Sequence, residues 1–237
     1  MKKIYDILKA KWAEYLIEMI VIIAGILVAS GLNSWKDGKT RSERSEEYLN
    51  AFLGDLADDT TSFNAAIQRI ESNFQSYDQV LTKEIFNQDL ENIERAIMHR
   101  TTYNLYLGPD LVFQKMRNHG FHGSPEYEQI FDQLNAYYQS KLELHEIVHW
   151  DYEALLDAWS LLQQDMNFEM RSKYYQWGKD SLSNRENKKN DLIKFGSGSI
   201  YRNTILMDIS RKHKLKMAFI EQKQEAEELI KMISERA

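Results

Sequence analysis

The stretch that decides the architecture is YLIEMIVIIAGILVASGLNSW, residues Tyr15 to Trp35. A helix of this length, at about 1.5 Å of rise per residue, crosses a hydrocarbon core about 30 Å thick. Trp12 and Trp35 lie where the aromatic belts of a membrane helix meet the lipid head groups. The stretch therefore predicts a membrane-spanning helix. The alternative is a cleaved signal peptide, for which residues 29–31 supply the small side chains.

Two features inside the predicted membrane helix bear on its contacts. Glu18 lies about one turn inside the boundary, where a carboxylate is costly unless it reaches the head groups, takes up a proton or pairs with a neighbouring subunit. Gly25 and Ala29 lie four residues apart, a spacing that lets two membrane helices approach closely. The sequence therefore leaves Glu18 as either a snorkelling or a paired carboxylate, and it predicts self-association through Gly25 and Ala29.

The residues around this helix suggest an orientation. Each flank carries four Lys or Arg residues, so the positive-inside rule finds no imbalance. The short Lys-rich tail resembles the start of a signal anchor. This predicts a single-pass anchor with a cytoplasmic tail and a C-terminal domain on the other side of the membrane. The predicted organisation is a basic tail (1–14), a transmembrane helix (15–35), a charged linker (36–47) and a helical-bundle domain (48–237).

Composition narrows the class of protein. The 237 residues are 43% hydrophobic and 28% charged, with two prolines, ten glycines and no cysteine. Such a chain builds an apolar core without disulfides or thiolate metal sites, and its low Pro and Gly content favours helices. Up to Arg44 there are eight basic and five acidic residues, a net charge of +3, whereas the rest has 22 and 31, a net charge of −9. Nucleic acid is therefore not an expected partner.

Beyond Gly38 the apolar residues recur in alternating steps of three and four. The series from Leu49 to Leu81 predicts one long helix from about Arg41, roughly 60 Å long, which could continue the membrane helix. A seam of this kind packs equally well within one chain or between chains. Phe86 to Ile97 predicts a second, shorter helix.

Two further helices complete the predicted bundle. Residues 124–126, Ser-Pro-Glu, form a helix start with a capping hydroxyl, a proline at the first position and an acid in the first turn. The helix that they open could reach Trp177, and its predicted core stripe includes Phe131, Leu134, Tyr138, Leu142 and His145. A polar connection then leads to a last helix from about Ser199 to the C-terminus. The sequence thus predicts an all-α protein, with one N-terminal transmembrane helix followed by an antiparallel bundle of long helices.

The chain resembles a known family, specifically near its N-terminus and more loosely over most of its length. The weaker matches are Thr102-Tyr103, Tyr127 to Tyr138 and Ser199 to Asn203. From Glu18 to Asp59 the chain is similar to the opening of uncharacterised single-pass membrane proteins found mainly in Bacteroidota. The family pattern has a Glu entering an apolar run, a Gly-Ile-Leu-Val-Ala core, an Asn-x-Trp exit and a charged linker into a Tyr-Leu helix. This chain departs from the usual Asn-x-Trp-Asn-Glu exit, with Lys36 and Asp37 after the Trp. The resemblance implies an anchor in a bacterial inner membrane and a helical domain, which the predicted orientation places in the periplasm, but it implies no chemistry. The matching positions are Glu18, Gly25 to Ala29, Asn33 with Trp35, and Tyr48-Leu49 to Asp55-Leu56.

The strongest enzymatic signal is His145-Glu146-Ile147-Val148-His149. On a helix this HExxH pattern places two imidazoles one turn apart for zinc, with Glu146 positioned to activate a metal-bound water. However, charged residues flank the motif, and His145 falls on the apolar stripe of its helix, where a histidine is typically a core residue. We therefore expect no cofactor, and the alternative is a zinc ion bound by His145 and His149.

Three other clusters are weaker candidates. His119 and His122 lie in a loop that either binds a metal or forms a polar turn. Residues 196–199, Gly-Ser-Gly-Ser, either hold an anion or connect and cap a helix. The basic cluster from Arg211 to Lys216 either binds lipid head groups or pairs with acids on adjacent helices.

The predicted function follows from the anchor and the bundle. We expect a membrane-anchored interaction, scaffold or sensory subunit of the cell envelope. Its expected partners are the lipid bilayer and either a second copy of the chain or another envelope protein. The alternative is a zinc-dependent hydrolase that uses His145, Glu146 and His149.

Overall fold

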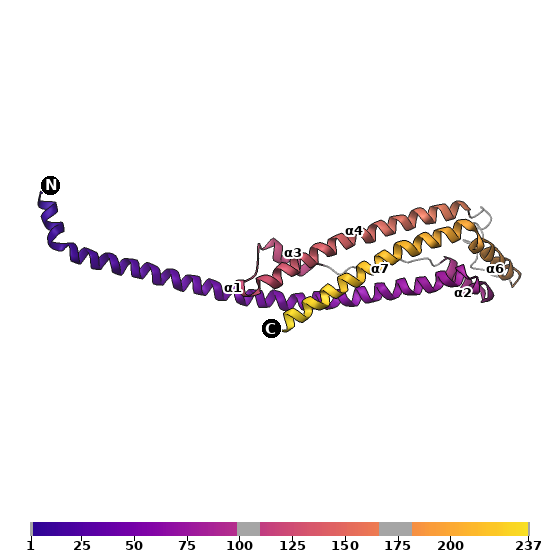
Figure 1. Ribbon diagram of the computed structural model, residues 1–237, viewed down its shortest axis with the longest axis horizontal. Helices are drawn as coiled ribbons and strands as arrows, with labels where there is room; N and C mark the ends of the chain where they lie inside the picture. The colour runs from indigo at the N-terminus through magenta and orange to yellow at the C-terminus, as the bar shows by residue number, and fades with distance from the viewer. Residues whose placement is uncertain (1, 99–109, 166–181, 237) are drawn as a thin grey trace.

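A computed structural model describes residues 2–98, 110–165 and 182–236. Every regular element within these ranges is a helix, so the protein is all-α as predicted. Figure 1 shows one very long N-terminal helix that leads into an elongated bundle. The predicted end of the long helix at Trp177 lies outside the described residues.

Helix α1 runs without interruption from Lys2 to Leu81, a length of 80 residues. At about 1.5 Å per residue it is about 120 Å long. The predicted charged linker, residues 36–47, is part of this helix. The N-terminal part of α1 projects away from the bundle, and its C-terminal part runs along the bundle (Figure 1). The predicted membrane segment and the bundle therefore share one backbone helix.

The bundle is formed by the second half of α1 together with α4 (Glu128–Asp165) and α7 (Ser199–Ser234). Helices α1 and α4 run in the same direction, and α7 returns antiparallel to both (Figure 1). The most extensive packing is that of α7 against α1 and against α4. The predicted start of the last helix at Ser199 is confirmed.

Shorter helices close the end of the bundle farthest from the N-terminus. They are η1 (Glu84–Asn87), α2 (Leu90–Met98) and α6 (Leu182–Ser197). The sequence predicted a polar connection before Ser199, but residues 182–197 form a helix that buries Leu192 and Phe195. Gly196 permits this contact, because a Cβ atom there would lie 2.8 Å from Ile97 Cδ1. The glycine serves close packing, which argues against the anion-binding alternative.

At the opposite end of the bundle, α3 (Leu111–Asn118) and η2 (Pro125–Tyr127) precede α4. The predicted helix start at residues 124–126 has the right position, but Ser124 makes no capping hydrogen bond. Its backbone N–H instead donates to Ser45 Oγ on α1 at 2.9 Å, and its hydroxyl donates to Glu126 at 3.1 Å. Tertiary contact with α1 has replaced the local cap.

The core face of α4 differs from the predicted apolar stripe. Leu142 and His145 are exposed, whereas Lys141, Leu144 and Asp151 are buried. The prediction that His145 lies on the core stripe is therefore wrong. The physical reason is that two charged side chains take core positions, which turns the neighbouring apolar residues toward solvent.

Candidate functional site

Residues 16–35 of the predicted membrane segment are all exposed in the single chain. Trp12 and Trp35 are 61% and 69% exposed, and Glu18 and Ala29 are also exposed. A Cβ atom added at Gly25 would meet nothing within 4 Å. By length and composition α1 is long and apolar enough to cross a membrane, and none of its most apolar window is buried. No other described part of the chain packs over these large apolar side chains, so their burial would require a bilayer or a second molecule.

The HExxH motif lies on the outer face of α4. His145, Glu146 and His149 are all exposed, and one helical turn separates the two imidazoles as predicted. His149 Nε2 lies 3.3 Å from Glu153 Oε1 on the same helix. In the ranges that the structure describes, no third His, Asp or Glu joins them in a group that could hold a metal ion. The described residues therefore provide two histidines one turn apart but no third ligand for a metal ion. The zinc site stays a hypothesis.

Among the described residues, His119 and His122 belong to no group of three or more side chains that could hold a metal ion. His119 Nδ1 shares a hydrogen bond of 3.0 Å with the Tyr48 hydroxyl on α1, and His122 is exposed. The basic cluster on α7, by contrast, pairs with acids of neighbouring helices. Lys216 Nζ lies 2.7 Å from Glu71 on α1, as the second alternative predicted.

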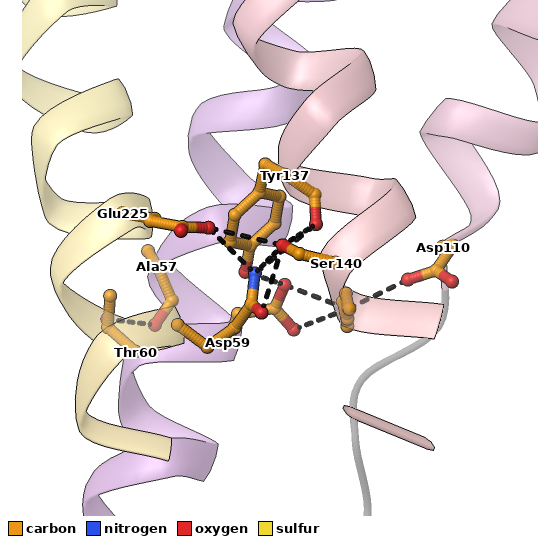
Figure 2. A network of polar contacts seen from close by, with 9 residues as sticks. Ala57, Asp59, Thr60, Asp110, Tyr137, Ser140 and Glu225 are labelled. Carbon is orange, nitrogen blue, oxygen red and sulfur yellow. Dashed lines mark hydrogen bonds and ion pairs between the residues drawn. The ribbon is translucent and has the colours of Figure 1, made fainter. Parts of the chain in front are cut away.

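A buried ionic layer joins three elements near the N-terminal end of α4 (Figure 2). Lys141 Nζ on α4 lies 2.8 Å from both carboxylate oxygens of Asp59 on α1. It also lies 2.8 Å from Asp110 Oδ1, directly before α3. The Tyr137 hydroxyl donates to Asp59 Oδ2 at 2.7 Å. One ammonium group thus binds two carboxylates from separate segments, and the side chains of Lys141 and Asp59 are 1% and 2% exposed.

Polar contacts from α7 extend this layer. Gln222 Nε2 donates to the Tyr137 carbonyl at 3.2 Å, and the Ser140 hydroxyl lies 3.1 Å from Gln222 Oε1. The Ser140 hydroxyl also lies 3.2 Å from Glu225 (Figure 2). All three long helices therefore contribute to one polar cross-section. Buried polar contacts of this kind fix the register in which helices pack.

The electrostatics of the layer favour neutral tyrosines. Burial and the nearby Asp59 carboxylate raise the pKa of Tyr137, and burial raises the pKa of Tyr138. Burial also raises the pKa of Asp55, against the opposing effect of a hydrogen bond from the backbone of Val112. The Tyr138 hydroxyl and Asp55 Oδ2 have no hydrogen-bond partner among the described residues. Around Lys141 the layer holds two carboxylates, those of Asp59 and Asp110, against one ammonium group.

A second ionic layer lies about 15 Å farther along α4, ten residues beyond Lys141. Lys212 Nζ lies 3.5 Å from Asp151 Oδ2, and Arg211 pairs with both Asp151 and Asp208. The Tyr77 hydroxyl donates to Asp208. Burial raises the pKa of Asp151 and lowers that of Lys212, because each charged form loses water. Lys212 is 1% exposed, so this part of the basic cluster is core rather than solvated surface.

Apolar layers separate the ionic ones. Between the two layers pack Phe63, Ile70, Leu144 and Phe219, and further apolar clusters lie toward each end of the bundle. The sequence analysis missed both ionic layers because it treated charged residues as surface. A signal was present, since Asp59 and Lys141 fall at core spacing on their helices and carry opposite charges. The layers explain the register of the bundle but supply no reactive centre.

Comparison with protein-family models, curated proteins and solved structures gave no match. The family resemblance of the N-terminal region therefore stays a prediction.

Proposed function

We propose that the protein is a membrane-anchored interaction protein in which α1 crosses a bilayer and carries the helical bundle on one side. The observation that carries this proposal is the complete exposure of the apolar window of α1. Twelve large apolar side chains are exposed between Leu16 and Trp35. Their exposure to water would be strongly unfavourable, whereas a hydrocarbon core covers them. These residues belong to the same helix as the part of α1 that packs in the bundle, so α1 is both anchor and scaffold.

The chemistry of α1 also supports a partner within the membrane. The free surface at Gly25 and the exposed Ala29 allow a second helix to approach closely. Glu18 lies on the same side, seven residues before Gly25, where pairing would shield its carboxylate. A second copy of the chain is the partner that these features favour, with another envelope protein as the alternative.

The proposed location is a bacterial inner membrane with the bundle in the periplasm. The Lys-rich tail and the resemblance of residues 18–59 to inner-membrane proteins support this placement. The chain contains no cysteine, so a single introduced cysteine reports position without background. His122 is exposed in the loop before α4 and suits this purpose.

The test is labelling of a His122→Cys variant with a membrane-impermeant maleimide. We expect labelling once the outer membrane is opened while the inner membrane is intact, and we expect the protein to stay with the membrane after alkaline extraction. A cysteine in place of exposed Leu27, inside the apolar segment, is the matched control and should resist the reagent. Labelling of His122→Cys only after full lysis would place the bundle in the cytoplasm, and release by alkali would contradict the anchor.

A further inference from the structure

An open groove lies between α1 and α3, at the end of the bundle nearest the membrane segment. Its volume is about 420 Å³, within the range of about 300–1,000 Å³ that is typical of small-molecule sites. Tyr48 and Phe121 form one wall, with ring centroids 5.0 Å apart, and Ala51 and Val112 contribute apolar surface. The hydrogen bond between Tyr48 and His119 holds the two elements together at this point.

The groove also carries an excess of positive charge. Arg44 and Lys115 line it from α1 and α3, against one acid, Glu47. Neither cation forms an ion pair with any residue that the structure describes, whereas the buried lysines Lys141 and Lys212 are paired. An apolar floor beside two available cations is complementary to a ligand with an apolar body and an anionic head.

We propose that this groove binds a soluble single-chain amphiphile with a carboxylate or phosphate head. The position on α1 selects a soluble ligand over a bilayer lipid. Arg44 lies nine residues beyond Trp35, about 14 Å along the helix, and an average tilt of about 20° hardly shortens this distance. Head groups extend only about 5–8 Å beyond the hydrocarbon core. The choice of a soluble ligand rests on the proposed membrane placement, whereas the groove itself does not.

The test uses the full-length protein in phosphatidylcholine nanodiscs and a decanoic acid probe that carries a photoreactive diazirine. After irradiation, the labelled peptides are mapped by mass spectrometry. We expect labelling of residues 44–51 and 111–121, and about tenfold less labelling by the matching decanol, which has no charge. In an Arg44→Gln/Lys115→Gln variant, labelling by the acid should fall about tenfold. The reason is that the loss of a hydrogen bond to a charged group lowers affinity by about tenfold or more.

The control variant is Lys194→Gln/Lys214→Gln, which removes two exposed charges elsewhere and should label as wild type. Equal labelling by acid and alcohol, or no effect of the groove substitutions, would overturn the proposal. A diacyl phosphatidic acid probe in the nanodisc should label residues 16–35 and spare the groove. If it labels the groove as strongly as the decanoate does, the ligand is a bilayer lipid and the proposal is wrong. If it spares residues 16–35, the membrane placement fails while the groove assignment stands on its own labelling.

Discussion

Lys141 occupies a core position of α4 although it carries a charge. Its ammonium group binds Asp59 and Asp110, and it lies 5.5 Å from the centre of the Tyr138 ring. Two carboxylates and an aromatic face replace the water that it loses. Removal of the ammonium group would leave Asp59 buried without a counterion, which is costlier than the loss of an exposed ion pair.

We therefore expect Lys141→Ala to lower the free energy of unfolding by about 3–5 kcal/mol. Leu142→Ala, one residue away, should change it by only about 0.5 kcal/mol, because Leu142 is 44% exposed. Urea denaturation of the full chain in detergent, followed by far-UV circular dichroism, measures both values. The pair tests the register of α4, since the apolar stripe read from the sequence predicts the opposite order. A larger loss for Leu142→Ala would refute the ionic layer as core.

Charged residues at core positions also explain which parts of the fold the sequence predicts. The apolar periodicity of α1 predicts its buried face correctly, because Leu49, Phe52 and Phe63 lie in the core. On α4 the same method fails, since Lys141 and Asp151 are core residues that a hydrophobic pattern discards. Helix α6 was missed for a related reason. Its sequence is rich in Asn and Lys, and only Leu192 and Phe195 reveal the side that packs. Which residues of α4 and α6 are buried depends on the side chains that distant helices pack against them. The sequence of a single segment does not contain this information.

At the scale of single elements, the turn before α4 depends on two glycines with positive φ. Gly120 has a φ of +59° and Gly123 a φ of +79°. A Cβ atom at Gly120 would meet nothing within 4 Å, whereas at Gly123 it would lie 2.2 Å from Phe131 Cδ2. Phe131 is 1% exposed and belongs to the core, so it has little room to move. Both glycines thus adopt a left-handed backbone conformation, but only Gly123 packs against a core side chain.

This difference predicts two distinct costs for substitution by alanine. Gly120→Ala should destabilise the fold by about 1–2 kcal/mol, the cost of a left-handed conformation in a residue with a Cβ atom. Gly123→Ala should cost about 1–3 kcal/mol more, because Phe131 must shift in a packed core. Thermal or urea unfolding of both variants measures the difference directly. Equal losses would mean that Phe131 adapts freely and that only the backbone matters at this turn.

In the whole molecule, the continuity of α1 links the proposed membrane segment to the bundle. Gly25 and Gly54 lie 29 residues apart, about eight full turns at 3.6 residues per turn, so they share one face of the helix. Both are open, with nothing within 4 Å of an added Cβ atom. If two chains pair through Gly25 and Ala29, the rigid helix brings the Gly54 positions of both chains toward each other outside the membrane.

A Gly54→Cys variant should therefore form an intersubunit disulfide in oxidised membranes. Arg41→Cys, exposed on another side of α1, is the control and should cross-link weakly. Adding Gly25→Leu should reduce the Gly54→Cys cross-link several-fold, because a bulky side chain in the membrane prevents the close approach of the two helices. Non-reducing electrophoresis measures the dimer fraction in each case. A cross-link that persists unchanged with Gly25→Leu would show that the membrane helix is only a tether and that any assembly resides in the bundle.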